Sequence, residues 1–356
     1  MKTETSMEEP TVHMEEGEAM ALSVRILTGH GLSDAHAQAM ARVIVAGQRD
    51  ACASHGMYRL ISCVRTIRAG KVDLQAEPVL SARPGSALVR VDARRAFASR
   101  ALEVGCPALV EAARSTGVAA LVVNQAFHFS ALWPEVEAIA AQGLVALAMT
   151  PSHVCVAPAG GTRPVFGTNP IAFAWPRGAG KPPYVFDFAT SAVAHGEIEL
   201  HQREGRALPP GWGVDADGRP STDPAAVMQG ALLTFGGHKG SALSTMVELL
   251  AGVLIGDWTS AEASAFDDGA HVIPCRGELV LAFDPAQLGG GEGLAHMPRA
   301  EGLFDAITGQ GARLPSQRRQ AARRRSRSHG IAIPKALLDD IHALLRDCPG
   351  HAAVET

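Results

Sequence analysis

Hydrophobic and polar residues alternate along this chain with a period that changes several times. Between residues 17 and 70 apolar residues recur at helical spacing, and Ser33 or Asp34 is placed to cap a helix rich in alanine. A second helix is predicted over 54–67 and ends before Gly70. The N-terminal part of the chain is therefore expected to be helical.

Short apolar runs then indicate the buried strands of a sheet. Strands are predicted over 87–92, 117–124 and 144–150, with helices over 100–116 and 132–142 between them. Strand, helix and strand at this spacing predict an α/β core with connecting helices.

The later part of the chain is rich in loops, with a few isolated elements. A short strand is predicted over 184–188, an apolar helix over 240–255 and another strand over 278–283. The first residues, 1–18, are acidic and polar, which predicts a disordered tail, and they lack the apolar stretch of a signal peptide.

These patterns divide the chain into four parts. A tail over 1–18 precedes an N-terminal helical segment over 19–84. An α/β core over 85–312 follows, and a C-terminal helical segment over 313–356 is expected to pack with the N-terminal part.

Composition narrows the class of protein. Of 356 residues, 47% are apolar, which is enough for a substantial core, and the net charge of −4 gives no reason to expect binding to nucleic acid or a membrane. The apolar run over 242–255 is too short to span a membrane and contains Glu248. Six cysteines without a C-x-x-C pair indicate reduced thiols in the cytoplasm.

The most informative local pattern is Ser54-His55-Gly56, followed by Arg59. If this segment is helical, His55 and Arg59 share one face. Histidine moves protons near neutral pH, and arginine binds a carboxylate with two hydrogen bonds, so the pair suggests a small carboxylate substrate that gains or loses a proton. The same spacing is also common on solvated helix faces and in ion-pair networks.

Common cofactor and catalytic motifs do not occur. No G-x-G-x-x-G follows a strand, the glycines around Lys239 do not have P-loop spacing, and the histidines show no metal-binding spacing, so no metal is expected. The segments 128–132 and 236–241 open predicted helices, where backbone N–H groups are free to hold an anion. A basic cluster over 318–327 is typical of a solvated face or of a phosphate site.

Several of these segments together resemble a known family. The ordered set is Ser54-His55-Gly56 with Arg59, His128-Phe129-Ser130-Ala131-Leu132, 166–170, Asp187-Phe188-Ala189 with 190–191, 236–240 with His238, and Arg313-Leu314-Pro315. It resembles the type-2 malate/L-lactate dehydrogenase family over residues 17–345. Three further stretches, 196–201, 208–215 and 235–241, are most similar to its cyclic-imine branch, the Δ1-piperideine-2-carboxylate/Δ1-pyrroline-2-carboxylate reductases.

The resemblance implies a non-Rossmann NAD(P)H-binding core with a mixed sheet flanked by helices, and a homodimer. It implies that His55 is the proton donor, with Ser54 and Glu197 as its relay partners. It also implies that Arg59 binds the substrate carboxylate and that Thr168 contacts the substrate. Glu197 occupies a position at which some relatives have aspartate, so its longer side chain places the carboxylate at a different distance from the backbone.

Cofactor contacts are implied for three further groups of residues. They are His128, Phe129, Ser130, Ala131 and Leu132; Asp187, Phe188, Ala189 and His238; and Arg313, Leu314, Pro315, Ser316, Gln317, Arg318 and Arg319. The cofactor expected is NADPH, with NADH as the alternative, because a 2′-phosphate needs cationic donors such as those in the last group. Ser316-Gln317 departs from the Gly–acid pair of the family.

The function expected is hydride transfer to a cyclic imine carboxylate, giving L-pipecolate or L-proline. A 2-hydroxy-acid dehydrogenase of the malate or lactate type would use the same histidine and arginine, so their spacing does not separate the two activities. A catalytically inactive protein that senses a dinucleotide is a third reading, which the complete set of catalytic residues disfavours.

Overall fold

The apolar runs in the middle of the chain form one large sheet in the computed structural model, which describes residues 10–178, 180–290 and 294–348. Seven strands lie in the order β2-β3-β4-β11-β5-β6-β7, in which β3 and β4 are parallel and the other neighbours antiparallel. The strands are β2 (Val79–Ala82), β3 (Leu88–Asp92), β4 (Val118–Phe127), β5 (Val145–Met149), β6 (Ile171–Trp175), β7 (Tyr184–Phe188) and β11 (Cys275–Phe283). The predicted mixed sheet flanked by helices is confirmed.

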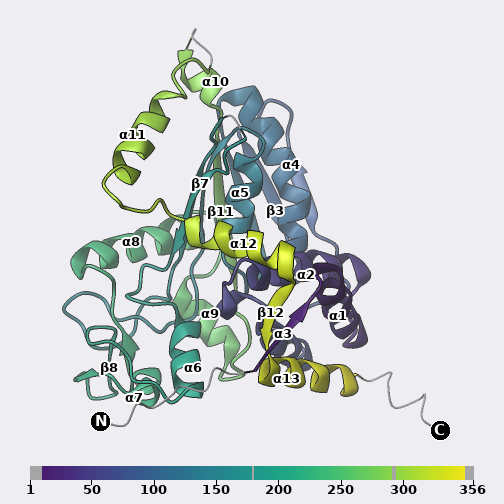
Figure 1. Cartoon of the computed structure of the whole chain (residues 1–356), viewed down its shortest axis with the longest axis vertical. Coiled ribbons are helices and arrows are strands. Elements are labelled where there is room, and N and C mark those ends of the chain that lie inside the picture. The colour runs from purple at the N-terminus through teal and green to yellow at the C-terminus, as the bar shows by residue number, and fades with distance from the viewer. Residues whose placement is uncertain (1–9, 179, 291–293, 349–356) are drawn as a thin grey trace.

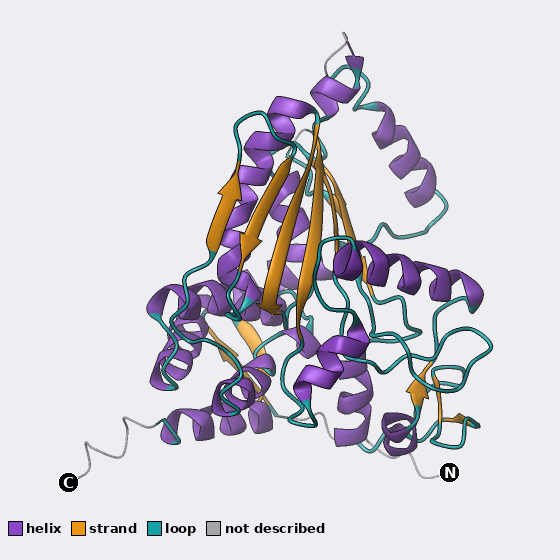
Figure 2. Ribbon diagram, turned by 180° about the vertical axis from the view of Figure 1, so that it is seen from behind, coloured by secondary structure: helices purple, strands orange, loops and turns teal. Residues whose placement is uncertain are grey.

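Two helices, α4 (Ala98–Thr116) and α5 (Trp133–Ala140), cover one face of this sheet (Figure 1). Gly105 lets α4 approach closely, because a Cβ there would lie 2.8 Å from Leu121 Cδ1. On the other face, α8 (His238–Glu248) and the π-helical turn η2 (Leu249–Val253) cover only part of the strands (Figure 2).

The two ends of the chain form a second layer below the sheet. Helices α1 (Glu16–Gly29), α2 (Asp34–Arg49), α3 (Arg59–Arg68) and α13 (Lys335–Arg346) share one hydrophobic core, which reaches the ends of β4 and β11. The Ser33 side chain caps α2, as predicted.

The prediction of a tail over 1–18 is wrong for its later part. Strand β1 (Thr11–Met14) pairs antiparallel with β12 (Ile331–Pro334), and α1 begins at Glu16. The alternation of Val12 and Met14, whose side chains pack on the core, is only four residues long and lies among acidic residues. Residues 1–9 lie outside the described residues.

Other element boundaries predicted from the sequence also differ from those in the structure. Strand β12 interrupts the C-terminal segment that was expected to be helical, and β2 already belongs to the sheet before residue 85. The apolar helix expected over 240–255 changes to the π-helical turn at Leu249. The limits expected at 84/85 and 312/313 remain predictions.

The remaining elements are short or lie at the edges. They are η1 (Ala53–His55), α6 (His195–Arg203), β8 (Gly213–Val214), β9 (Pro220–Ser221), α7 (Pro224–Gln229), β10 (Ala231–Leu232), α9 (Ser260–Asp267), α10 (Pro285–Leu288), α11 (Arg299–Thr308) and α12 (Gln317–His329). Helix α12 crosses in front of the lower end of the sheet (Figure 1). Within the described ranges no helix is both long and apolar enough to cross a membrane.

Candidate active site

A cavity of about 680 Å³ lies where the helical layer meets the lower end of the sheet. Its walls come from η1 and α3, from the loop after β4, from α6 and from the segment that leads into β11. His55, Arg59, Thr168 and the segment 128–130 all face it, so the structure brings together much of the expected substrate site.

His55 and Arg59 do not lie on one helix, and the expectation of a continuous helix over 54–67 is wrong. His55 ends the 3₁₀ turn η1, whereas Arg59 begins α3. The turn packs tightly on α2, because a Cβ at Gly47 would lie 2.3 Å from the His55 carbonyl oxygen. Both side chains line the cavity although they do not share a helix face.

His55 is held by its neighbour in the chain. Ser54 Oγ lies 3.1 Å from His55 Nδ1, which leaves Nε2 available to the cavity. Burial, followed by the charges of Arg59 and His128, lowers the pKa of His55 to about 3. Without a ligand the imidazole is therefore neutral at physiological pH.

Arg59 is a cation on the wall of the cavity. Its guanidinium makes no hydrogen bond or ion pair with any residue that the structure describes, and its Nε is fully enclosed. Gly196 lets α6 approach it, because a Cβ there would lie 3.4 Å from Arg59 Nη2. Burial lowers the pKa of Arg59, although not enough to discharge a guanidinium. An anionic ligand would satisfy this group.

The sequence reasoning missed a group of polar side chains opposite Arg59. The Tyr58 hydroxyl donates to Glu199 Oε2 at 3.2 Å, and His195 Nδ1 lies 3.5 Å from Glu199 Oε1. Glu199 lines the cavity, and the hydrogen bond from His195 together with the charges of His195 and Arg59 lowers its pKa despite burial. The i, i+4 spacing of His195 and Glu199 was the available signal.

Glu197, the expected relay acid, lies elsewhere on α6. Its carboxylate Oε1 is 3.9 Å from His201 Nε2, and it makes no hydrogen bond to Ser54 or His55 within the described part of the chain. Its role as a relay partner remains a prediction.

The loop after β4 forms another wall of the cavity, through His128, Phe129 and Ser130. Asp187 Oδ2 accepts hydrogen bonds from Leu132 N at 2.8 Å and Trp133 N at 2.9 Å, so it caps α5. The backbone N–H groups that were expected to be free for an anion at Leu132 are therefore occupied. Burial raises the pKa of Asp187 to about 6.

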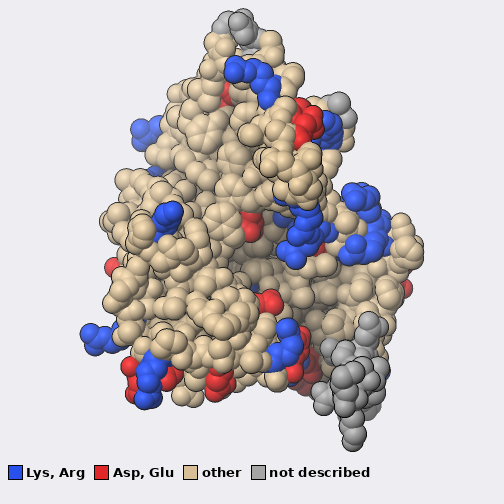
Figure 3. Space-filling view, turned by 60° about the vertical axis from the view of Figure 1, so that its left-hand side comes forward, with Lys and Arg blue, Asp and Glu red and all other residues tan. Residues whose placement is uncertain are grey.

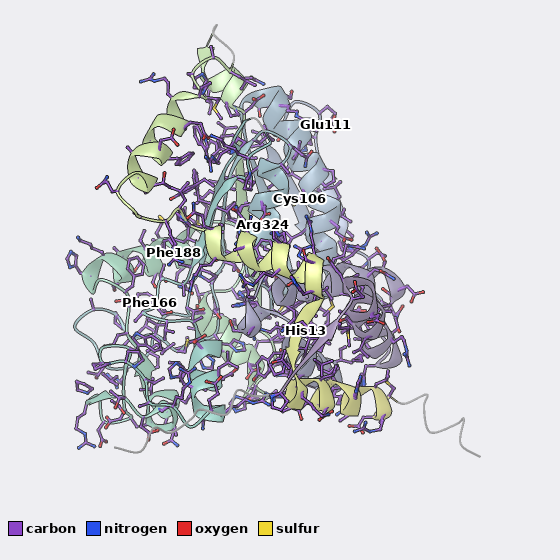
Figure 4. All side chains as sticks on the ribbon, viewed as in Figure 1. His13, Cys106, Glu111, Phe166, Phe188 and Arg324 are labelled. Atoms are coloured by element: carbon purple, nitrogen blue, oxygen red, sulfur yellow. The ribbon has the colours of Figure 1, made fainter. Side chains whose placement is uncertain are left out.

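A second cavity, of about 310 Å³, lies at the Tyr184 end of β7. Leu314, Pro315 and Gln317 line it together with Tyr184. Ser316 Oγ donates to the Val185 carbonyl, which ties the start of α12 to β7. Figure 4 shows Phe188, at the far end of the same strand, between α8 and α12.

The arginines of the C-terminal segment fall into two groups. Arg319 and Arg323 form ion pairs with Asp50 and Glu137 and lie over the Trp133 ring. The exposed side chains of Arg313 and Arg318 have no hydrogen-bond or ion-pair partner among the described residues. Basic side chains gather beside a hollow at the level of α12 (Figure 3).

These features fit an extended dinucleotide better than a compact ligand. Strand β7 extends roughly 13 Å, at about 3.3 Å per residue, from Tyr184 in the wall of the second cavity to Phe188. The aromatic ring of Phe188 is 42% exposed along this path, and His238 is exposed at the N-terminus of α8. Ala189 follows the strand, while Ala131 and Leu132 pack into the core behind it.

Comparisons with known proteins agree with this geometry. Residues 14–342 match the model of the family described as malate/L-lactate dehydrogenase. The chain is 62% identical over 328 residues to Delta(1)-pyrroline-2-carboxylate reductase 1 of Burkholderia ambifaria, covering 92% of this chain and 96% of the relative. It is 58% identical to the Delta(1)-pyrroline-2-carboxylate/Delta(1)-piperideine-2-carboxylate reductase of Pseudomonas aeruginosa, covering 94% and 99%.

A solved structure shows the same fold. The crystal structure of delta1-piperideine-2-carboxylate reductase from Pseudomonas syringae superimposes with a TM-score of 0.87 at 45% identity, covering 94% of this chain and 99% of the other.

Proposed function

The chain belongs to the malate/L-lactate dehydrogenase family, and we propose that it reduces the C=N bond of small cyclic imines that carry a carboxylate. The substrates are Δ1-pyrroline-2-carboxylate and Δ1-piperideine-2-carboxylate, and the products are L-proline and L-pipecolate. The observation that carries this proposal is the unpaired guanidinium of Arg59 beside His55 in one cavity.

In this mechanism Arg59 binds the substrate carboxylate and fixes which face of the ring is presented for reduction. When bound, a reduced nicotinamide would supply the hydride that reduces the C=N bond. The carboxylate offsets the charge of Arg59, which is one of the causes of the low pKa of His55. Ligand binding therefore favours protonation of His55, which then delivers its proton to the imine nitrogen while Ser54 holds Nδ1.

For the cofactor we propose NADPH in preference to NADH. The exposed, unpaired Arg313 and Arg318 are available for a 2′-phosphate, with His238 as a further donor. Replacing Arg318 with Gln should raise the KM for NADPH about tenfold and leave the KM for NADH unchanged. Equal effects on the two cofactors would contradict a 2′-phosphate site at Arg318.

We also propose a homodimer that acts in the cytoplasm. The apolar side chains of Leu249 and Val253 on the π-helical turn and of Leu254 directly after it are 54%, 59% and 68% exposed. Large apolar side chains exposed together on one turn are typical of an interface. Leu254→Glu should convert the dimer to a monomer, which light scattering would detect. The cytoplasmic location is proposed because the six cysteines are free thiols, which fit a reducing compartment.

The test of the reaction is NADPH oxidation with four substrates in parallel: the two cyclic imines, pyruvate and oxaloacetate. Fast turnover of the imines with little turnover of the oxo acids would support imine reduction. The opposite preference would assign the chain to the 2-hydroxy-acid dehydrogenases, and binding of NADPH without any turnover would indicate a sensor.

A further inference from the structure

Three polar side chains come together behind the wall of the large cavity, where the proposed mechanism does not use them. His128 comes from the loop after β4, Glu135 from α5 and Glu278 from β11, and they are 2%, 7% and 1% exposed. Of the three, only His128 is among the described residues that line the cavity. We refer to these three residues as the buried triad.

Most polar atoms of the buried triad have no hydrogen-bond partner in the part of the chain that the structure describes. This holds for both ring nitrogens of His128, both carboxylate oxygens of Glu278 and Oε2 of Glu135. Enclosing such atoms without a partner costs free energy, and buried charges in proteins are either paired or coordinate a metal. The buried triad therefore indicates a ligand that binds nitrogen and carboxylate oxygen together.

Arg276, two residues before Glu278 on β11, does not pair with these carboxylates. Its Nη1 donates to the carbonyl oxygens of His128 at 3.0 Å and Pro274 at 3.2 Å, and its Nε donates to Thr150 Oγ1 at 3.0 Å. Among the described residues it forms no ion pair with either glutamate of the triad. The guanidinium thus holds the loop that carries His128 and leaves the two carboxylates to another cation.

The distances within the buried triad suit a small metal ion. His128 Nε2 lies 3.2 Å from Glu278 Oε2, and one ligand atom of each residue lies within 4.8 Å of the others. Nitrogen and oxygen ligands lie about 2.0–2.2 Å from zinc, so two ligands of a tetrahedral shell are about 3.3 Å apart. The pair of His128 and Glu278 already has this separation, and the flexible side chain of Glu135 supplies a third ligand.

We propose that His128, Glu135 and Glu278 bind one divalent transition-metal ion, for which Zn²⁺ is the probe. One imidazole and two carboxylates are ligands that zinc accepts, and the two carboxylates balance its charge. Because both glutamates lie behind the cavity wall, the ion is structural and joins the loop after β4 to α5 and β11. The inference does not rest on the proposed function.

The spacing of histidines could not reveal this site. The expectation of no metal rested on the absence of histidines at metal-binding spacing. The buried triad contains a single histidine, and its two glutamates come from separate elements that only the fold brings together.

The test is the binding of Zn²⁺ to the untagged full chain after removal of metal with EDTA. Calorimetric titration of wild type with zinc chloride should show a single equivalent bound tightly. Metal that binds the folded chain stabilises it, so the melting temperature should rise by about 3–5 °C when zinc is present in excess.

Substitutions in the buried triad separate this site from zinc bound at surface side chains. His128→Asn and Glu278→Gln each remove one ligand, so zinc affinity should fall by about 10²-fold or more and the rise in melting temperature should disappear. Glu278→Asp keeps a carboxylate and should bind zinc more tightly than Glu278→Gln. Glu111→Gln, on the exposed face of α4 (Figure 4), is the matched control and should bind zinc as wild type does.

Two results would overturn the proposal. One is a wild-type chain that binds no Zn²⁺ and melts at the same temperature with and without it. The other is unchanged zinc affinity in the triad variants, with Glu278→Asp replacing Glu278→Gln in the comparison if the latter does not fold. Neither measurement uses turnover, so a chain that reduces no imine would contradict the proposed function and leave the zinc result to decide this proposal.

Discussion

Arg323 in its ion-pair cluster and Arg59 in the large cavity differ in how the charge of the guanidinium is balanced. Asp50 is 1% exposed and receives Arg323 through three hydrogen bonds, while Glu137 binds the same guanidinium from the other side. Arg59, on the wall of the large cavity, has no such partner in the described part of the chain. Arg319 and Arg323 make their ion pairs without a ligand, whereas the guanidinium donors of Arg59 are left free for one.

This difference shows that the role of an arginine is identified from its hydrogen-bond and ion-pair partners rather than from its position in a sequence motif. The basic cluster over 318–327 suggested a phosphate site, but two of its members hold α12 against α2 and α5. A guanidinium whose donors are enclosed without hydrogen-bond partners is costly, and proteins retain such groups where a ligand supplies the partners.

The largest effect is expected from removing the group beside the unpaired cation. His55→Asn should lower kcat on the cyclic imine by about 10²–10⁴-fold, because the proton donor is lost while Arg59 still binds the carboxylate. Steady-state kinetics would show little change in KM. A variant that retains the wild-type kcat would remove His55 from the mechanism.

Substitution of Arg323, which is paired with Asp50, should lower the stability of the protein rather than its turnover. Arg323→Met leaves the buried Asp50 without its main counter-charge and should lower the free energy of unfolding by about 2–3 kcal/mol. Urea denaturation measures this change. The activity of the folded fraction should stay within about twofold of wild type. A loss of turnover without a loss of stability would contradict a structural role for Arg323.

A smaller effect is expected from crowding the unpaired cation. Gly196→Ala places a Cβ 3.3 Å from Ser54 Cβ and 3.4 Å from Arg59 Nη2, so one of them must shift. We expect kcat/KM to fall about fivefold, which corresponds to about 1 kcal/mol. Gly302→Ala on α11, where a Cβ meets nothing within 4 Å, is the matched control.

A separate effect is expected in the pH dependence of stability. The pKa of His55 is lowered to about 3 and that of His153 to about 4, whereas both are near 6.5 when the chain is unfolded. The unfolded state then binds more protons between these values, so ligand-free protein should lose stability as the pH falls from about 6.5 to 4. His55→Asn should flatten this slope by at most about 1.4 kcal/mol per pH unit, measured by urea denaturation at several pH values. An unchanged slope would contradict the buried, neutral imidazole.

Much of the sheet could be predicted from the sequence because its strands are apolar runs with local signals. The separation of His55 and Arg59 onto two different elements could not be predicted. It depends on the close contact between Gly47 of α2 and the turn η1, which forms only when the chain folds back on α2. Glu199 was missed in favour of Glu197 because the rotation of α6 about its axis is decided by packing against Ser54 and Arg59.

The pairing of charges was equally hidden from the sequence. Arg323 and Asp50 are separated by 273 positions, and only the fold brings them together. The segments of the candidate site were therefore found as a set of motifs, whereas the roles of individual arginines required the structure.

The most direct test of the account compares Arg59→Lys with Arg323→Lys in the reduction of Δ1-pyrroline-2-carboxylate by NADPH. Both substitutions keep the charge and remove the planar fork. We expect Arg59→Lys to lower kcat/KM by about 10²-fold or more and Arg323→Lys to stay within about twofold of wild type. Equal kcat/KM values for the two variants would contradict the assignment of Arg59 as the carboxylate-binding residue.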